Sequence, residues 1–440
     1  MTKNLLLVFI LLFVSLKSLY SDEWEIQSFG QIGSLWDVHF IDNNKGWAVG
    51  CTGTIEGAPS TILFTSDGGE NWEKQNPGTN VMLFSVFFNS ENNGWAVGKE
   101  GTILNTTNCG QKWNYQNYDN DIWFRSVYFI NENKGWIVGY YHENKTPVLL
   151  YSSNKGENWN LTPINFQNLD LQQILFVDES NGWMAGGYSN LILHSTNGGN
   201  NWELQNINGV KPILSIFFTD SLSGWAVGGS YNRLTGCSNI ILQTNDGGRN
   251  WYIQSEGNNY QLFDVHFVDN NNGWAVGGFP SLSCGLYTSV ILHTTDGGIN
   301  WKEEGAVTES LLEGLFFVNK DYGWTVGVTN HGYESILHKK LDEPIFVQDE
   351  NLEYSKNNNS LCYPNPFSKT TTIKYETEKP GLIKISYYDN LGNILKYINK
   401  FQDAGNHAEV FNADNYATGI YFYKIQIGKK IESGKLFIIN

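Results

Sequence analysis

The segment LFSVFFNSENNGWAVGKEGTILNTTNCGQKWNYQN, residues 83–117, contains one complete copy of the unit from which most of this chain is built. An apolar run is followed by a polar turn, the sequence GWAVG, a second apolar run and a turn that ends at a tryptophan. The dipeptide Gly-Trp occurs seven times at intervals of 41–50 residues, with its tryptophan at Trp47, Trp95, Trp136, Trp183, Trp225, Trp274 and Trp324. Four short strands per unit and a repeat of this length predict an all-β fold, a seven-bladed β-propeller.

The turn before the fourth strand has the pattern S/T-x-D/N-x-G-x-x-W, which occurs six times in register. Its acidic or amide position is occupied by Asp67, Asn108, Asn154, Asn197, Asp246 and Asp296. Such a side chain accepts backbone N–H groups of its own turn, the glycine supplies a positive φ, and the tryptophan covers the hairpin. Because half of these positions carry Asn, which a turn tolerates and acid–base catalysis does not, we predict a structural role.

The last unit is incomplete, since it ends at residues 335–340 with neither this turn nor a fourth strand. The segment Trp24-Glu25-Ile26-Gln27 matches the fourth strand of the first unit, which begins at Trp72. We therefore predict that the N-terminal segment supplies the missing strand of the seventh blade. This closure would remove an exposed sheet edge.

Composition and charge exclude several classes of protein. The chain has 16 Trp, 23 Tyr and 25 Phe, too many aromatic residues for a disordered protein. Its net charge is −16 and it has three Arg (Arg125, Arg233 and Arg249), which argues against nucleic-acid binding. The five Cys and eight His show no metal-ligand spacing, so we expect neither a metal nor another cofactor. Cys237 and Cys284 lie in comparable loops of adjacent blades and are candidates for a disulfide.

Targeting signals are expected at both ends. Residues 1–21 combine a positive start with ten apolar residues, too few to span a bilayer, and are predicted to be a secretory signal peptide. We expect the propeller over residues 22–340, a polar linker over 341–360 and a small β-sandwich over 361–440, where alternating apolar residues and turn glycines recur.

Two family resemblances follow from these motifs. Residues 22–340, rich in GWAVG and DGGxxW, resemble the photosystem II stability/assembly factor-like group of BNR propellers, and the repeated turn resembles the Asp box of sialidase-type propellers. The tail motifs YPNPF, TTIKY, YYDNLG, GNH and GIYFYKI resemble a type IX secretion C-terminal sorting domain. This second resemblance implies the type IX secretion machinery as a partner and a protein that is secreted or attached to the cell surface.

Candidate binding residues are found where the repeats differ from one another. The second position of the first strand varies among Trp36, Phe84, Arg125, Gln172, Leu214, Phe263 and Glu313, and we expect these residues to ring one mouth of the central channel. Trp123, beside this position, is a further candidate. The long loops between the second and third strands of blades five and six add Tyr231, Arg233, Phe279 and Tyr287. This aromatic and polar mixture suits a sugar or a peptide.

Three functions are compatible with this pattern. The first is a non-enzymatic module that binds an extracellular protein or glycan, with no catalytic residue. The second is a sialidase- or xyloglucanase-like glycoside hydrolase, for which Asp37, Asp264 and Glu313 are the carboxylates expected at the channel mouth. The chain does not offer the cluster of three Arg that a sialidase needs. The third is a chaperone like the photosystem assembly factors, whose arginine-rich patch three scattered Arg cannot rebuild.

Overall fold

A computed structural model gives the fold of the protein. It describes residues 24–27, 33–52, 59–167, 169–186, 190–205, 207, 211–232, 236–257, 259–280, 287–304, 310–329, 335–340, 361–377, 379, 381–388, 394–413, 416–427 and 430–439. The chain divides into two compact units, Met1–Leu341 and Asp342–Asn440. The expected signal peptide, the expected linker, Arg233 and Cys284 lie outside the described residues.

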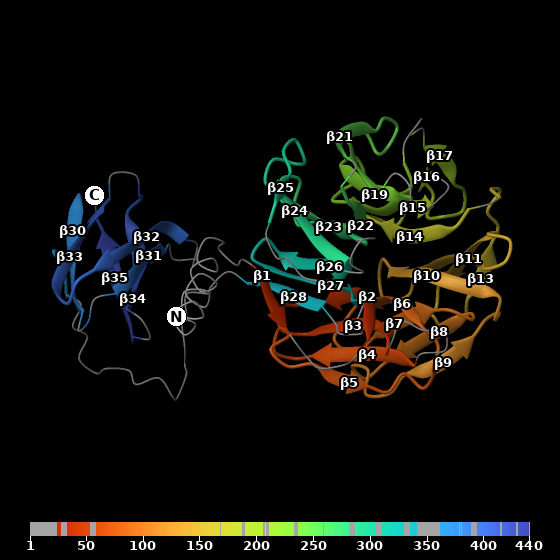
Figure 1. Ribbon diagram of the computed structural model, residues 1–440, viewed down its shortest axis with the longest axis horizontal. Coiled ribbons are helices and arrows are strands. Elements are labelled where there is room, and N and C mark those ends of the chain that lie inside the picture. The colour runs from red at the N-terminus through yellow and green to blue at the C-terminus, as the bar shows by residue number, and fades with distance from the viewer. Residues whose placement is uncertain are drawn as a thin grey trace, which may run out of the picture. The chain divides into compact units, whose positions relative to one another are not determined.

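The first unit contains seven antiparallel sheets of four strands each, arranged in a ring (Figure 1). The first strands are β2 (Ser34–Phe40), β6 (Leu83–Phe88), β10 (Ile122–Phe129), β14 (Leu171–Phe176), β18 (Ile213–Phe218), β22 (Gln261–Phe267) and β26 (Ser310–Asn319). The second strands are β3 (Gly46–Cys51), β7 (Gly94–Gly98), β11 (Gly135–Tyr141), β15 (Gly182–Gly186), β19 (Gly224–Asn232), β23 (Gly273–Pro280) and β27 (Tyr322–Thr329). Each first strand contacts the first strands of both neighbouring sheets, and β26 contacts β2, so the ring is closed.

The outer half of each sheet is formed by the third and fourth strands. The third strands are β4 (Ser60–Thr65), β8 (Thr102–Thr106), β12 (Pro147–Ser152), β16 (Leu191–Ser195), β20 (Gly236–Thr244), β24 (Tyr287–Thr294) and β28 (Ser335–Lys340). The fourth strands are β5 (Glu73–Gln75), β9 (Asn114–Asn117), β13 (Asn160–Thr162), β17 (Glu203–Gln205), β21 (Tyr252–Gly257), β25 (Lys302–Glu303) and, in the seventh blade, β1 (Trp24–Gln27). The predicted closure by the N-terminal strand is therefore confirmed.

The Gly-Trp repeat is explained by the packing between blades. A Cβ on Gly46 would lie 2.4 Å from the ring of Phe40, and the same close approach of glycine and phenylalanine occurs in all seven blades. The tryptophan of each blade stacks on the phenylalanine of the next, as Trp47 does on Phe88 at 3.5 Å between ring centroids. Trp324 of the last blade stacks on Phe40 of the first at 3.5 Å, so one contact type joins all the blades.

The six repeated turns have one hydrogen-bond pattern. In the first, the Thr65 hydroxyl donates to Asp67 at 2.9 Å and accepts from the Gly69 amide at 2.8 Å, while Asp67 also accepts the Asn71 amide at 2.9 Å. The tryptophan that ends each turn packs edge-on against the phenylalanine of its own blade, as Trp72 does against Phe40. In the seventh blade Trp24 makes this edge contact, with Phe317 at 5.8 Å.

The second unit consists of two small sheets. One is formed by β29 (Leu361–Tyr363), β30 (Thr370–Thr377) and β33 (Gly405–Asn412); the other by β32 (Ile394–Gln402), β31 (Gly381–Tyr388), β34 (Gly419–Ile427) and β35 (Lys430–Ile438). Buried side chains of both sheets, among them Tyr375 and Ile385, form a single apolar cluster. This is the expected small β-sandwich.

Candidate functional site

A β-bulge lies at the same place in the first strand of every blade. In the first blade the pairing of β2 with β3 shifts register between Leu35 and Asp37, so Trp36 has no partner in the ladder. The equivalent shift occurs in the other six sheets. The unpaired residues are Trp36, Phe84, Arg125, Gln172, Leu214, Phe263 and Glu313. A bulge turns the side chain of the extra residue away from the regular alternation of the strand.

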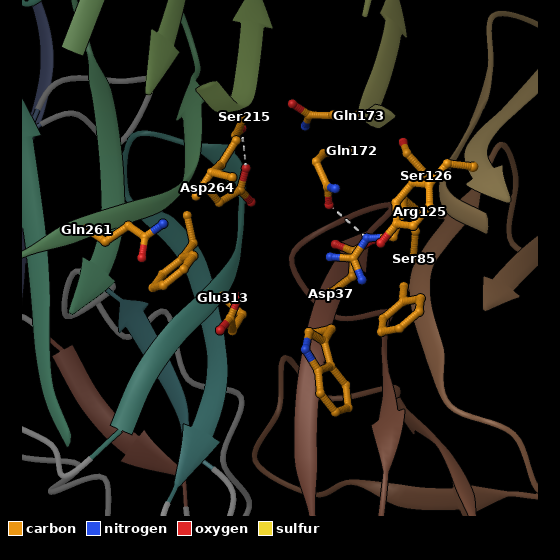
Figure 2. Close-up of a pocket in the computed structure, with 15 residues that line it drawn as sticks. Asp37, Ser85, Arg125, Ser126, Gln172, Gln173, Ser215, Gln261, Asp264 and Glu313 are labelled. Atoms are coloured by element: carbon orange, nitrogen blue, oxygen red, sulfur yellow. Dashed lines mark hydrogen bonds between the residues drawn. The ribbon is translucent and has the colours of Figure 1, made fainter. Parts of the chain in front are cut away.

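All seven bulge residues line one cavity of about 370 Å³ at a mouth of the channel. Figure 2 labels three of them, Arg125, Gln172 and Glu313, whose side chains approach a common space from different first strands. The cavity is also lined by the following third position, occupied by Asp37, Ser85, Ser126, Gln173, Ser215 and Asp264, and by Tyr140 and Gln261. Sequence comparison did not single out the serines, Gln173, Tyr140 or Gln261. A polar residue at the third position in six of the seven repeats was a signal that could have found most of them.

The third-position side chains hold each blade to the next. Asp37 accepts the backbone N–H of Val86 in blade two at 2.9 Å. The equivalent backbone N–H groups of the other blades donate to third-position side chains in the same way. The pairs are Val127 to Ser85 (3.4 Å), Ile174 to Ser126 (3.4 Å), Ile216 to Gln173 (2.6 Å), Val265 to Ser215 (3.3 Å) and Leu315 to Asp264 (2.8 Å). In the seventh blade the position is Gly314, where a Cβ would lie 2.8 Å from the Trp36 carbonyl oxygen.

Two of the three candidate carboxylates are therefore engaged on both oxygens. Asp37 accepts the Val38 amide on Oδ1 and the Val86 amide on Oδ2. Asp264 accepts the Ser215 hydroxyl at 2.7 Å on Oδ1 and the Leu315 amide on Oδ2. Desolvation inside the channel raises the pKa of Asp37 to about 7 and that of Asp264 to about 6, although these hydrogen bonds oppose the rise.

Glu313 and Arg125 are different, because each keeps hydrogen-bonding capacity directed at the cavity. Within the described residues Glu313 makes no hydrogen bond or ion pair, and desolvation raises its pKa to about 7 while the charge of Arg125 opposes that rise. Arg125 donates from Nε to Gln172 at 2.8 Å, and its guanidinium carbon lies 4.1 Å from the centroid of the Phe84 ring. Its terminal nitrogens have no partner within the described part of the chain.

Below the cavity, the fifth positions of the first strands bring aromatic and histidine side chains together around the channel. His39 contacts Phe87 at 4.8 Å and Phe316 at 4.7 Å between ring centroids, and His266 contacts Phe316 at 5.0 Å. Desolvation lowers the pKa of His39 to about 4 and that of His266 to about 3, and the proximity of His39 adds to the second shift. Both imidazoles are therefore neutral at neutral pH.

A basic–aromatic platform, formed by Lys99, Trp123, Tyr140, His142 and Lys145, adjoins the cavity. The Trp123 ring stacks on His142 at 3.8 Å and lies 4.3 Å from the Lys99 ammonium, while Lys145 lies 4.4 Å from the Tyr140 ring centroid. The platform meets the cavity through Tyr140, which lines it, and through Trp123, whose ring centroid is 6.2 Å from that of Phe84.

The remaining candidates lie elsewhere. Tyr231 is exposed on β19, whereas Phe279 on β23 and Tyr287 on β24 are half-buried, and none of them lines the cavity. Cys237 is buried on β20. Its pairing with Cys284 stays a prediction, because Cys284 is outside the described residues. The described residues contain no group of three or more His, Cys, Asp or Glu able to hold a metal ion.

These features define the protein as a seven-bladed β-propeller with a lined cavity at one mouth of its channel. The family model described as Photosynthesis system II assembly factor YCF48 matches residues 16–120, 76–168 and 200–309, together more than half of the chain. The chain therefore belongs to this family. A second model, described as a secretion system C-terminal sorting domain, matches residues 361–440. This type IX sorting domain indicates secretion or attachment to the cell surface.

Solved structures agree with this fold. YCF48 bound to D1 peptide is 20% identical with a TM-score of 0.56, over 74% of this chain and 99% of that chain. YCF48 from Cyanidioschyzon merolae is 18% identical (TM-score 0.53, 72% and 98%), and an ancestral GH74 enzyme is 12% identical (TM-score 0.52, 94% and 63%). At these identities the similarity shows the fold alone. A comparison with curated proteins found no match. Within the described residues no helix has the length and apolar character that crossing a membrane requires.

Proposed function

We propose that this protein is a non-enzymatic binding module for a protein or glycan outside the cell, and that the cavity with its adjoining basic–aromatic platform is its binding site. The single observation that carries this proposal is the cavity itself. Its lining comes from bulge residues whose identity the repeat does not dictate, surrounded by scaffold positions that barely vary. A concave site of this kind, with aromatic residues and convergent polar groups, is the usual form of a ligand site.

The hydrogen bonds support binding over glycoside hydrolysis. Hydrolysis needs a pair of carboxyl groups free to act on the substrate, one of them as acid and the other as base or nucleophile. Asp37 and Asp264 instead each accept the amide of the following residue on one oxygen and an amide of the next blade on the other. Among the described residues that line the cavity, Glu313 is therefore the one carboxyl group that is free to act, and hydrolysis needs two.

A role as a photosystem assembly chaperone is supported less well. YCF48 has been solved bound to D1 peptide, which makes a peptide one ligand to test here. Arg125 is the one Arg among the cavity lining residues, and Arg249 lies in an exposed repeated turn. The sorting domain directs this chain outside the cell.

We propose the following organisation for the rest of the chain. Residues 1–21 act as a signal peptide, 22–340 form the propeller, 341–360 link the two units, and 361–440 form the sorting domain. The six repeated turns are Asp boxes, and their Asp or Asn side chains have a structural role, which the hydrogen bonds of Asp67 support.

The proposal is tested by blocking the cavity. Leu214→Trp places a large ring at a bulge position that already carries Trp36 in the first blade, whereas Leu204→Trp adds the same ring to exposed β17. Native extracellular medium and a glycan array are probed with the wild type and both variants. We expect bound partners to be lost with Leu214→Trp and kept with Leu204→Trp. Equal capture by all three proteins would contradict a ligand site at the cavity.

A further inference from the structure

Three cationic side chains around the site lack an ion-pair partner within the described residues. They are Lys99, Arg125 and Lys145. Elsewhere in the propeller many cations are paired: Lys45 with Glu91, Lys134 with Glu179, Lys155 with Glu132, Lys211 with Glu256 and Lys339 with Glu304. In a chain of net charge −16, these three cations are groups to which an anionic ligand can bind.

These cations are held on aromatic rings. Lys99 lies over Trp123, Arg125 over Phe84, and Lys145 over Tyr140. Cation–π contacts position a charged group while leaving its N–H donors available, because an aromatic face accepts no directional hydrogen bond as a carboxylate does. The three cations therefore keep donors for a ligand, with Arg125 in the cavity lining and Lys99 and Lys145 on the platform that adjoins it.

The cavity itself is suited to a ring that carries hydroxyl groups. Its polar lining is dominated by side-chain amides and hydroxyls, including Gln172, Gln261 and Ser126, which can both donate and accept. Trp36 and Phe263 offer apolar surfaces of the kind on which sugar rings pack. A volume of about 370 Å³ is at the low end for ligand pockets, which suits the end of a chain rather than a folded surface.

We propose that the cavity and the basic–aromatic platform together bind an acidic polysaccharide, with the carboxylate of a terminal uronic acid residue at Arg125 and the following uronic acid residues along Lys99 and Lys145. The planar guanidinium suits bidentate binding of a carboxylate, and the ammonium groups suit a flexible anionic chain. The proposal rests on the proposed function, because it names the ligand class of the same site.

The carboxyl groups that line the cavity oppose an anion less as the pH falls, so the affinity for an acidic ligand should rise from about pH 7 to about pH 5. Desolvation raises the pKa values of Asp37 and Glu313 to about 7 and that of Asp264 to about 6, so their negative charge is reduced at neutral and mildly acidic pH. Below them His39 and His266 are neutral and add no charge. At pH 7 Asp264 is still mostly ionised and Asp37 and Glu313 are about half ionised, so Arg125 becomes the dominant charge of the cavity lining only as the pH falls below about 6.

The test is isothermal titration calorimetry of the full chain with trimers of galacturonic acid and of glucuronic acid, each compared with its methyl ester. The ester keeps the sugar ring and removes the charge. We expect one acid trimer to bind at least tenfold more tightly than its ester, since hydrogen bonds to charged groups are the stronger ones. The affinity should fall as salt is increased.

Variants divide the site into its two parts. Arg125→Gln should weaken binding of the acid trimer at least tenfold and reduce its preference over the ester to the smaller part contributed by Lys99 and Lys145. Lys99→Gln with Lys145→Gln should weaken binding less and flatten the salt dependence, because these groups contribute screened charge–charge attraction. Lys74→Gln, exposed on outer strand β5, should change nothing. Tryptophan fluorescence spectra that match the wild type establish that each variant is folded.

Other results would overturn the proposal. Equal affinity for acid and ester would remove the role of the carboxylate, yet leave the cavity as a binding site. Tighter binding of an acidic peptide such as hexaglutamate than of either trimer would point to a protein ligand. If neither trimer binds while partners captured from native medium still depend on an open cavity, the ligand class is wrong and the proposed function stands.

Discussion

A buried charged group, Glu304, connects blade six to blade seven, the blade that the N-terminal strand completes. Glu304 follows β25 in blade six. Its carboxylate accepts Trp24 Nε1 of the N-terminal strand at 2.9 Å, Lys339 Nζ of β28 at 2.9 Å and 3.0 Å, and lies 2.7 Å from His293 Nδ1 of β24. The side chains of Lys339 and Glu304 are only 5% and 9% exposed. Glu304 therefore joins the sixth blade to both outer strands of the seventh.

Glu304→Gln should destabilise the propeller severely. The amide keeps the shape of the side chain and removes the charge, so the buried Lys339 ammonium loses its ion pair with Glu304. Removing one partner of a buried pair costs about 3–5 kcal/mol. The measurement is urea unfolding followed by tryptophan fluorescence, which reports on the propeller alone because all 16 Trp precede residue 341. Glu303→Gln, on the exposed neighbouring residue, is the matched control and should change stability by less than about 0.5 kcal/mol.

Glu304 also makes the stability of the propeller depend on pH. Burial alone would raise the pKa of Glu304, but the hydrogen bond to His293 and the charge of Lys339 lower it well below its usual range. Because the pKa of Glu304 is lower in the folded protein than in the unfolded chain, ionised Glu304 stabilises the fold at pH values above its unfolded pKa, near 4.5. This contribution is lost as the pH falls below that value. The Glu304→Gln variant should lack this acid-dependent loss. The role of Glu304 is refuted if Glu304→Gln lowers the free energy of unfolding by less than about 1 kcal/mol at pH 7, or if Glu303→Gln lowers it by as much.

Three further predictions concern the channel and the blade contacts. Neutral His39 destabilises the fold as the pH falls from 6.5 to about 4, because its imidazole is protonated in the unfolded chain before it is protonated in the folded protein. His39→Phe, which copies Phe87 of blade two, should remove this part of the acid destabilisation, up to about 3 kcal/mol in urea titrations. An unchanged pH profile would contradict the lowered pKa. Trp324→Phe should lower the free energy of unfolding in urea by about 1–3 kcal/mol more than Trp47→Phe does. The Trp324 indole donates to the Gly68 carbonyl at 3.0 Å, whereas the buried Trp47 indole N–H has no hydrogen-bond partner within the described residues. Equal losses of stability would show that this hydrogen bond contributes nothing. Gly314→Ser copies the serine found at this position in other blades. It should nevertheless lower the free energy of unfolding by about 1–3 kcal/mol, seen as a lower melting temperature, because its Cβ would lie 2.8 Å from the Trp36 carbonyl oxygen. A more stable variant would mean that the blades move apart readily.

Most of the fold could be predicted from the sequence because its packing code is local and repeated. Each Gly-Trp pair implies a phenylalanine ring against the glycine and a tryptophan directed at the next blade, so seven copies imply seven interfaces. The same logic assigned Trp24 to the place of a missing turn tryptophan, and its edge contact with Phe317 confirms that assignment. Departures from the repeat also pointed to Trp36, Phe84 and Arg125, which line the cavity.

The role of the carboxylates could not be predicted in this way. Asp37 and Asp264 stood out as acidic residues near the channel, but their hydrogen-bond partners are amides of the next blade, about fifty residues away in the sequence. The bulge that frees the second position does leave a signal in the residue pattern, because buried apolar residues are three apart across it, as at Leu35 and Val38, and two apart after it. We did not recognise this break in the alternation from the sequence alone. The platform around Trp123 depends on Lys99 from another blade and on His142 and Lys145 beyond the next strand.

The sequence by itself determines the number of blades, their order and the strand that closes the ring, because each of these follows from a motif that is repeated along the chain and buried in the same way each time. The tertiary structure alone decides which side chains face one another across the channel, because every blade contributes a single bulge residue to the cavity. It also separates the engaged carboxyl groups of Asp37 and Asp264 from that of Glu313, which makes no hydrogen bond within the described residues, since a hydrogen bond between blades forms only when the two neighbouring blades are packed together.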